Sequence, residues 1–397
     1  MKVVIAVDSF KGSMSSMEAG EAAREGVLLA RDASVVVRPL ADGGEGTTEA
    51  LVEGLGGSYV EVEVSGPMTE RVTARYGILG DGRTAVMEMA KAAGITLVKH
   101  EDLNPWQAST VGVGEMIRDA IGRGCREFII GIGGSATTEG GIGMLQALGY
   151  EFYDKTGQLL PPRLASLGEI ARIDDSHVMP ELEDCSFRVA CDVTNPLCGK
   201  NGAVYVYGPQ KGVKKEERAL LDAKFRHYAE ETEKFLRKKH GMATGDNQSG
   251  NSDSRMAGRE NGAFYPGAGA AGGLGFAFLS YLPHAKLKPG ISIVLDAVRL
   301  EEELADADIV LTGEGRLDGQ TAMGKAPVGV ARLAKKHGCR VIAFAGSVAE
   351  DAAVCNTEGI DAFFPIVRGV TTLSEAMNPE NAKNNMRRAV EQVFRLL

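Results

Sequence analysis

The sequence lacks the cysteine and histidine patterns that would indicate a structural metal site or a disulfide-stabilised scaffold. Its six cysteines form no C-x-x-C pair, and its six histidines form no cluster with them. In a chain of 397 residues we expect these cysteines to be reduced, several of them in the core. A G-x-S-x-G segment and a Ser/His/Asp arrangement are also missing, which argues against the common serine hydrolases.

Basic charge and long apolar runs are scarce as well. The formal net charge is -9 and no basic stripe stands out, so we expect no nucleic-acid partner. The N-terminal apolar run stops at Asp8 and is too short for a signal peptide. The long uncharged window at 261–283 contains Pro266 and six glycines, so we expect no membrane span. These features predict a cytoplasmic protein with no membrane partner.

Glycine, by contrast, is abundant. The 51 glycines lie in clusters flanked by hydrophobic runs, which is typical of tight loops in a folded protein. Hydrophobic residues make up 44% of the chain and charged residues 24%, the composition of a globular protein. The length suffices for two or three domains with a large core.

Strand and helix patterns alternate at both ends of the chain. At the N-terminal end we expect strands at 3–7, 35–39 and 60–64 and helices at 15–30 and 47–55. At the C-terminal end we expect strands at 308–312, 339–345 and 362–366 and helices at 325–336 and 381–397. This alternation predicts a parallel, doubly wound sheet. Neither end has enough strands for a sheet of five or six, so we predict one sheet built from both termini.

The middle of the chain is predicted to form a second, inserted domain. Residues 72–78 and 84–88 alternate around a glycine-containing turn, which favours a hairpin and therefore a mixed sheet. Further strands are expected at 127–131 and 188–193, each leading into a special loop. The polar segment 241–261 is interpreted as a surface excursion. The predicted domains are 1–66 plus 291–397, and 67–290.

Five loops share one pattern, in which a buried strand is followed by acidic or small residues. They are residues 8–13, 41–46, 131–141, 192–195 and 312–321. The carboxyl ends of parallel strands line up along one edge of a sheet, and ligands bind there. Asp and Gly are ordinary turn residues, so one such loop would mean little. Five of them indicate a functional site.

The loop at 131–141 is the best candidate for binding phosphate. Its small residues let the backbone approach an anion, and the N-terminus of the helix that follows would point at it. Residues 131–136 also fit G-x-G-x-x-A, with Glu151 twenty residues beyond Gly131, which is the dinucleotide-binding fingerprint. An NAD-dependent oxidoreductase is therefore an alternative function, and a tight packing turn is the structural alternative.

Three other motifs are weaker. Residues 319–326 nearly match a P-loop, but Ala326 replaces the hydroxyl that binds magnesium, so we reject a Walker-type site. Lys325 is then either a surface cation or a phosphate ligand. Residues 266–275 contain G-x-G-x-x-G with no preceding strand, and Lys211 lies in a turn, where we expect a solvated lysine.

Together these motifs resemble the bacterial glycerate kinases of the first class, which phosphorylate D-glycerate with Mg-ATP. The resemblance runs essentially from end to end and is carried by 8–13, 41–47, 76–79 with 88–90, 131–141, 191–197, 208–212, 266–275 and 313–325. It implies an α/β protein of two domains, a flavodoxin-like parallel-sheet domain formed by both termini and an inserted restriction-endonuclease-like α/β domain with a mixed sheet. It also implies ATP and Mg²⁺. Thr138 and Glu139 stand where relatives often carry Asn-Asp, which puts metal or phosphate contacts there in doubt.

The needs of phosphoryl transfer assign roles to the loop residues. Mg²⁺ prefers carboxylate and phosphate oxygens, a carboxylate can accept the proton of the attacking hydroxyl, and a guanidinium can hold the substrate carboxylate. The predicted catalytic residues are Asp42, Asp192, Lys11 and Arg316. Asp42 and Asp192 are the first choices for base or metal ligand, with Asp8, Glu314 and Asp318 behind them. The predicted metal ligands are Asp192, Glu314 and Asp318. The predicted ATP ligands are Gly133, Gly134, Ser135, Thr137 and Lys325. The predicted substrate ligands are Asp8, Ser9, Glu45, Arg316, Gln320 and Thr321.

Several alternatives stay open on the sequence alone. Any one carboxylate could instead cap a helix or form a turn. The oxidoreductase predicts tight NAD binding with the ribose near Glu151, and a non-catalytic sensor of small acids predicts binding without ATP turnover. The sequence does not decide whether the chain forms a homodimer. The resemblance favours 2-phosphoglycerate as the product.

Overall fold

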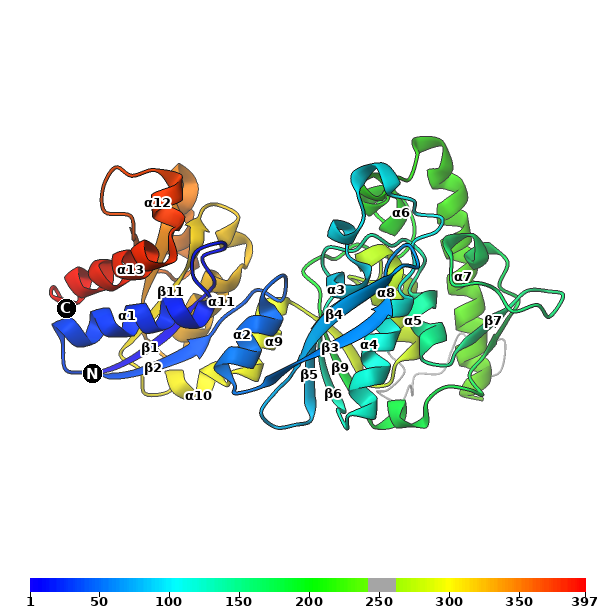
Figure 1. Cartoon of the computed structure of the whole chain (residues 1–397), viewed down its shortest axis with the longest axis horizontal. Helices are drawn as coiled ribbons and strands as arrows, with labels where there is room; N and C mark the ends of the chain where they lie inside the picture. The colour runs from blue at the N-terminus through cyan, green and yellow to red at the C-terminus, as the bar shows by residue number, and fades with distance from the viewer. Residues whose placement is uncertain (242–261) are drawn as a thin grey trace. The chain divides into compact units, whose positions relative to one another are not determined.

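The computed structural model describes residues 1–241 and 262–397, and the rest of the polar segment predicted at 241–261 lies outside the described residues. The chain divides into two compact units (Figure 1). Unit 1 comprises Met1–Gly57 and Pro289–Leu397, and unit 2 comprises Ser58–Lys288. Within the described ranges, no helix is both long and apolar enough to cross a bilayer.

Unit 1 is built on a parallel sheet with the strand order β13-β12-β11-β1-β2. Its strands are β1 (Lys2–Val7), β2 (Ser34–Pro39), β11 (Ile309–Leu317), β12 (Arg340–Val348) and β13 (Ala362–Pro365). Its helices are α1 (Ser16–Ala30), α2 (Thr47–Gly54), α9 (Gly290–Ala297), α10 (Leu300–Leu304), α11 (Ala326–Lys336), α12 (Leu373–Met377) and α13 (Pro379–Phe394). Counted along the chain, this is the doubly wound order 2-1-3-4-5. The prediction of one parallel sheet from both termini is confirmed.

The interior strand β1, between β11 and β2, is buried on both faces, as a doubly wound sheet requires. Val3, Ile5 and Val7 belong to a core that α1 and α13 complete, and the alternate residues Val4 and Ala6 are fully buried too. The helix α1 begins at a capping box in which Ser15 and Glu18 bond each other's backbone N–H groups. The strand order reverses at β1, which is where this class of fold binds its ligands.

Two strand predictions for this region were wrong. Residues 60–64 were expected to add a third parallel strand to the first sheet, but β3 (Ser58–Ser65) pairs antiparallel with β4 (Arg71–Ile78) in unit 2. The alternating pattern of residues 58–65 fits a partly exposed antiparallel strand just as well. Residues 313–317 were expected in a loop, but they extend β11, whose pairing with β12 continues to Leu317.

Unit 2 contains a six-stranded mixed sheet with the order β10-β9-β6-β5-β4-β3. Its other strands are β5 (Thr84–Glu88), β6 (Glu127–Gly131), β9 (Ser186–Ala190) and β10 (Ala285–Lys288), with β7 (Glu151–Tyr153) and β8 (Arg172–Asp174) in a separate two-stranded sheet. Its helices are α3 (Ala90–Ala93), α4 (Val111–Gly122), α5 (Ile142–Ala147), α6 (Ala203–Tyr207), α7 (Arg218–Lys239) and α8 (Ala270–Tyr281). The hairpin predicted between 72–78 and 84–88 is present as β4 and β5.

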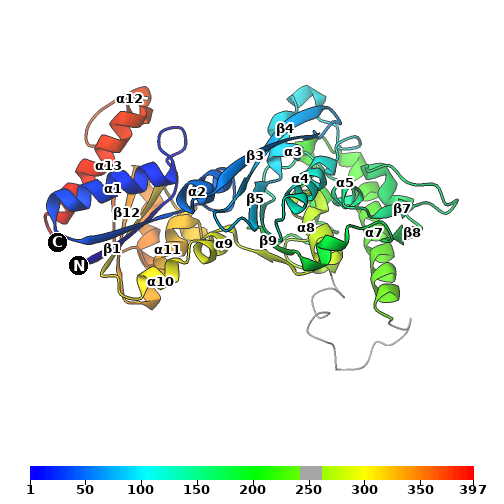
Figure 2. The same ribbon diagram turned by 60° about the horizontal axis from the view of Figure 1, so that its bottom comes forward.

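The sheet of unit 2 is mixed because only its β3-β4-β5 end is antiparallel. The strands β5, β6, β9 and β10 run parallel, and stacked Phe128 and Phe187, with ring centroids 4.8 Å apart, fill the core beside them. Figure 2 shows the helices of this unit around the sheet from a second side. The α/β class with one parallel and one mixed sheet is thus confirmed, while the restriction-endonuclease-like label stays a prediction.

Candidate functional site

Three carboxylates come together at the carboxyl edge of the unit 1 sheet. Asp8 directly follows β1, Asp42 lies in the loop between β2 and α2, and Glu314 lies on the extension of β11. The N–H of Asp8 donates to the carbonyl of Gly313 over 2.8 Å, so strand pairing places Asp8 beside Glu314. The charges of Asp42 and Glu314 both act on Asp8.

Burial and this crowding of negative charge change the acidity of Asp8 and Glu314. Burial, the largest cause, and the charges of Asp42 and Glu314 together raise the pKa of Asp8 to about 7, against a hydrogen bond from the N–H of Ser9 and the positive charge of Lys11. Burial also raises the pKa of Glu314, against a 2.5 Å hydrogen bond from Thr321 Oγ1 and the positive charge of Lys325. A cation or a cationic ligand at this edge would relieve the repulsion.

A hollow of about 410 Å³ opens next to these loops, within unit 1. Ser9, Lys11 and Glu45, all predicted site residues, line it together with the first turns of α1 and α2. This is the size of a pocket for a small molecule. The structure therefore places these three residues around one space.

The segment after Glu314 contains both a candidate ligand and a turn former. Arg316 is exposed, and its Nε lies 3.6 Å from Asp318 Oδ2. Asp318 Oδ1 accepts the N–H groups of Gln320 and Thr321 over 3.0 and 3.3 Å. Asp318 thus stabilises the turn that leads into a short 3-10 helix, Thr321–Met323. Turn formation was the structural alternative stated for each predicted carboxylate.

In unit 2, the predicted phosphate loop at 131–141 has an exposed tip and a buried base. Gly133 and Gly134 are exposed, whereas Ser135 and Thr137 are buried. The carbonyl of Gly134 accepts the N–H of Ile95, and the N–H of Gly140 donates to the carbonyl of Gly272. A side chain at Gly133 would meet nothing within 4 Å, so the backbone at the tip is open to a ligand.

The expectation of a solvated Lys211 was wrong. Its side chain is only 1% exposed, and its Nζ donates to Ser135 Oγ and to the carbonyl of Thr137, both over 2.6 Å. Burial lowers the pKa of Lys211 to about 7, and the charge of Glu139 opposes that effect. The one signal in the sequence was the placement of the lysine between Gly208 and Gly212, since Gly212, with φ +96, ends the short 3-10 helix that carries Lys211.

The expected role of the following helix as an anion site was also wrong. The helix α5 has only six residues, and the N–H of Gly143 in its first turn donates to Glu139 Oε2 over 2.8 Å. Glu139 is buried, and its other oxygen accepts from Thr110 Oγ1 over 2.7 Å. Burial raises the pKa of Glu139 to about 7. Glu139, which departs from the family pattern, therefore forms its hydrogen bonds inside the protein. The sequence did not predict that Glu139 would help to hold the loop in place.

The dinucleotide fingerprint is not realised. Glu151 lies in β7, which pairs with β8 in a separate two-stranded sheet, whereas the neighbours of β6 in its sheet are β5 and β9. A ribose-binding carboxylate would have to follow a strand beside the one that carries the glycine loop. Glu151 instead accepts one hydrogen bond from the hydroxyl of Tyr153, and its Oε2 lies 3.1 Å from His177 Nδ1. The predicted alternative of an NAD-dependent oxidoreductase is therefore wrong, because Glu151 is not where a ribose-binding carboxylate would lie.

The predicted site residues fall into two groups, one in each unit. Unit 1 holds Asp8, Ser9, Lys11, Asp42, Glu45, Glu314, Arg316, Asp318, Gln320, Thr321 and Lys325. Unit 2 holds Gly133, Gly134, Ser135, Thr137 and Asp192. Lys325 was grouped with the ATP loop, but it lies in unit 1 near Glu314. Among the described residues, no set of three or more His, Cys, Asp or Glu side chains is arranged to hold a metal ion.

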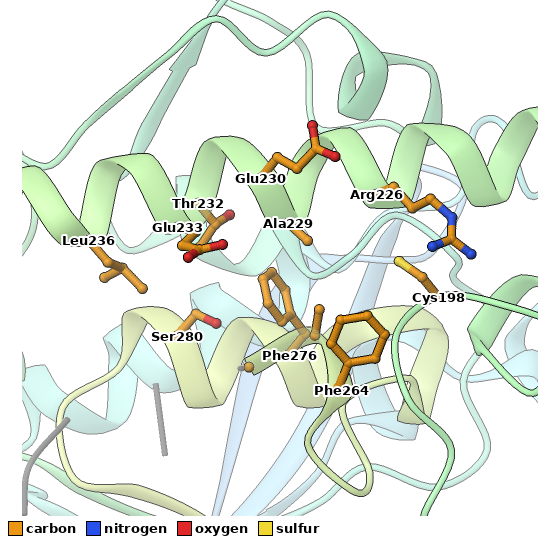
Figure 3. Close-up of a pocket in the computed structure, with 12 residues that line it drawn as sticks. Cys198, Arg226, Ala229, Glu230, Thr232, Glu233, Leu236, Phe264, Phe276 and Ser280 are labelled. Atoms are coloured by element: carbon orange, nitrogen blue, oxygen red, sulfur yellow. The ribbon is translucent and has the colours of Figure 1, made fainter. Parts of the chain in front are cut away.

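A separate hollow of about 170 Å³ lies between α7 and α8 (Figure 3). Phe264 and Phe276 contribute apolar surface to it, and Arg226 at its rim pairs with Asp222 over 2.9 Å. None of the residues that line it is among the predicted site residues. It is therefore no part of the candidate site.

Comparison with known proteins gives one consistent result. The model of the glycerate kinase family matches residues 3–397. The chain is 44% identical over 394 residues to a glycerate kinase of Bacillus subtilis and 43% identical to a glycerate 2-kinase of Escherichia coli, in each case over 99% of this chain and 97% of the relative. A crystal structure from Salmonella typhimurium LT2, described as glycerate kinase 2, superposes with a TM-score of 0.86 at 42% identity, over 99% of this chain and 97% of that one.

Proposed function

The chain belongs to the glycerate kinase family, whose members are phosphotransferases, and we propose that it transfers the γ-phosphoryl group of ATP to D-glycerate. The observation that supports this most is the meeting of Asp8, Asp42 and Glu314 beside a small-molecule hollow at the switch point of the unit 1 sheet. Phosphoryl transfer depends on positioning and charge stabilisation, and such an edge provides both. The E. coli relative is named a glycerate 2-kinase, which favours 2-phosphoglycerate as the product here too.

Magnesium fits the chemistry of the unit 1 edge. Its ligands in kinases are one or two carboxylates, with phosphate and water oxygens completing the shell. Burial first, and neighbouring carboxylates second, raise the pKa values of Asp8 and Glu314, and a cation there would favour their charged forms. Glu314 and Asp318 are the proposed ligands, with Asp192 as the carboxylate of unit 2 suited to the same task. When bound, the ion would neutralise charge on the transferring phosphate.

The remaining side chains of unit 1 are proposed to act on glycerate. Asp42 is the general base, because the N–H of Gly44 holds its Oδ1 at 2.8 Å and fixes the carboxylate, and Asp192 is the alternative base. Arg316 holds the glycerate carboxylate, and Lys11 offsets charge on the reacting groups. Asp8, Ser9, Glu45, Gln320 and Thr321 are the proposed polar contacts around the substrate.

The glycine-rich loop of unit 2 is proposed to hold the ATP phosphates. The exposed backbone of Gly133 and Gly134 makes the contact, since peptide N–H groups bind phosphate oxygens well. Ser135 and Thr137 are buried, so their part is to fix the shape of the loop. Lys325 is proposed to act in unit 1, beside Glu314.

The test is to incubate the protein with D-glycerate and Mg-ATP, with L-glycerate as the control acceptor. We expect ADP and phosphoglycerate to form in equal amounts from D-glycerate, and phosphorus NMR of the product to show 2-phosphoglycerate. Binding of D-glycerate without release of ADP would contradict the kinase and favour a non-catalytic sensor. Formation of 3-phosphoglycerate would overturn the assigned position only.

A further inference from the structure

We propose that Lys211 is a positioning residue that holds the glycine-rich loop at 131–141 in the shape that binds the phosphates of ATP. The proposal rests on the proposed function and adds to it a residue outside the loop. Lys211 belongs to a short 3-10 helix, Pro209–Lys211, far along the chain from the loop. Its side chain is buried against the base of the loop rather than exposed at its tip.

Lys211 fastens the loop at two points, two residues apart. Its Nζ donates to the side-chain oxygen of Ser135 and to the main-chain carbonyl of Thr137, each over 2.6 Å. One ammonium group thereby fixes both a side chain and the backbone just after the exposed tip. A neutral apolar side chain of the same length would leave both oxygens without this donor.

The segment 266–275 packs against the same part of the loop. A Cβ at Gly272 would lie 2.1 Å from the carbonyl oxygen of Thr137, and the N–H of Gly140 donates to the carbonyl of Gly272. Ala271, Gly272 and Gly273 all have positive φ, which bends this segment onto the loop. The carbonyl of Thr137 is thus packed by Gly272 and bonded by Lys211, so its position depends on both.

The charge of the lysine needs a reason, because burying an ammonium group is costly. A methionine would fill similar space at less desolvation cost. The charge of Glu139 acts on the pKa of Lys211, but the Glu139 carboxylate accepts its hydrogen bonds from Thr110 and Gly143. Burial lowers the pKa of Lys211 to about 7, and an anion bound above the exposed glycine tip would favour the ammonium form of the lysine. The hydrogen bonds that fix the loop and the attraction of its lysine for phosphate therefore support the same role for Lys211.

The test compares the wild type with Lys211→Met, Lys211→Gln and the matched control Lys215→Met, which removes an exposed lysine nearby. Calorimetry with Mg-ATP and steady-state kinetics are run on all four folded proteins. We expect K211M to raise Kd and KM for ATP about tenfold or more, because two hydrogen bonds from a charged donor are lost. KM for D-glycerate should stay within about twofold, K211Q should be intermediate, and K215M should match the wild type.

Each outcome bears on one claim. Equal Kd for ATP in wild type and K211M would overturn the role of Lys211 while leaving the kinase intact. A wild type that binds ATP but transfers no phosphate to D-glycerate would remove the proposed function, and the role of Lys211 would still be judged from Kd. A parallel rise in KM for both substrates, or loss of folding in both K211M and K211Q, would make Lys211 a general structural residue and overturn the proposal.

Discussion

The two units carry their charges in opposite ways. In unit 1, Asp8, Asp42 and Glu314 lie close together with the same sign, at a partly exposed edge next to a hollow. In unit 2, Lys211 and Glu139 are fully buried, and each is bonded to the protein itself. The first arrangement is destabilised until a ligand supplies positive charge, whereas the second is already satisfied.

This difference separates groups that bind ligands or catalyse from groups that fix the conformation of a loop. Like charges held together at an open edge are retained against their own repulsion, which is typical of catalytic and ligand-binding sites. Buried charges with internal hydrogen bonds fix one conformation of the loop that they touch. We therefore expect substitutions in unit 1 to affect turnover, and those under the loop of unit 2 to affect shape and nucleotide affinity.

The largest effect is expected from Asp42→Asn. The substitution preserves size but removes the ability to accept a proton, so kcat should fall at least about a hundredfold, equivalent to about 2.7 kcal/mol. The melting temperature should not fall, because one charge leaves a repulsive cluster. Steady-state kinetics and thermal melting measure the two quantities.

Asp32→Asn, at an exposed position outside the cluster, is the control for that experiment and should behave as the wild type. Near-normal turnover in folded D42N would transfer the role of base to Asp192, which is then tested by Asp192→Asn in the same assay. Normal turnover in both variants would contradict carboxylate base catalysis in this chain.

A smaller effect, on stability rather than turnover, is expected from Gly272→Ala in unit 2. Gly272 has φ +67, and a Cβ there would lie 2.1 Å from the carbonyl oxygen of Thr137. Gly82→Ala is the matched control, because Gly82 has φ +65 and a Cβ there would meet nothing within 4 Å. Both variants carry the strain of a left-handed alanine, and only G272A adds a clash.

We therefore expect G272A to lower the free energy of unfolding by about 2 kcal/mol more than G82A, measured by urea denaturation. G272A should also weaken ATP binding, because the clash displaces the loop base that Lys211 holds. Equal destabilisation by the two variants would show that the 266–275 segment shifts to relieve the clash without loss of stability. The contrast between the open edge of unit 1 and the rigid loop of unit 2 would then be weaker.

Much of this arrangement was predictable from the sequence because it is local. Strand ends followed by acidic or small residues predicted the loops at 8–13, 41–46 and 131–141, and helical periodicity over 15–30 predicted α1. The extension of β11 was not predictable in this way. Its residues Gly313 and Gly315 suggest a loop, and they form a strand only because β12 continues alongside them.

The buried charges were missed for a related reason. Lysine is exposed in most turns, and only tertiary contacts with Ser135 and Thr137 bury Lys211. Glu139 was noted as a departure from the family pattern, but its partner Thr110 lies 29 residues away, in a segment without any motif. Sequence pattern identifies loops well, whereas the pairing of side chains between loops requires the fold.

The smallest effect is expected from Asp8→Asn, through the pH dependence of stability. The pKa of Asp8 is about 7 in the folded state against 3.8 as the ordinary value, so the unfolded chain ionises first and stability falls as pH rises from about 4 to about 7. The uncharged amide of the D8N variant carries no such penalty. D8N should gain about 1 kcal/mol over the wild type at pH 8, after allowance for solvent screening, and nothing near pH 4. Denaturation at both pH values measures the difference.

The same experiment in a D42N background tests whether the carboxylates of unit 1 act on one another. The charge of Asp42 is one cause of the raised pKa of Asp8, second in effect to burial among the causes that raise it. Removing that charge should lower the pKa of Asp8, so the gain of D8N at pH 8 should shrink without vanishing. An unchanged gain would mean that the charge of Asp42 does not act on the acidity of Asp8. Asp8 and Asp42 would then be neighbours without electrostatic coupling, and the contrast with the buried charges of unit 2 would be weaker.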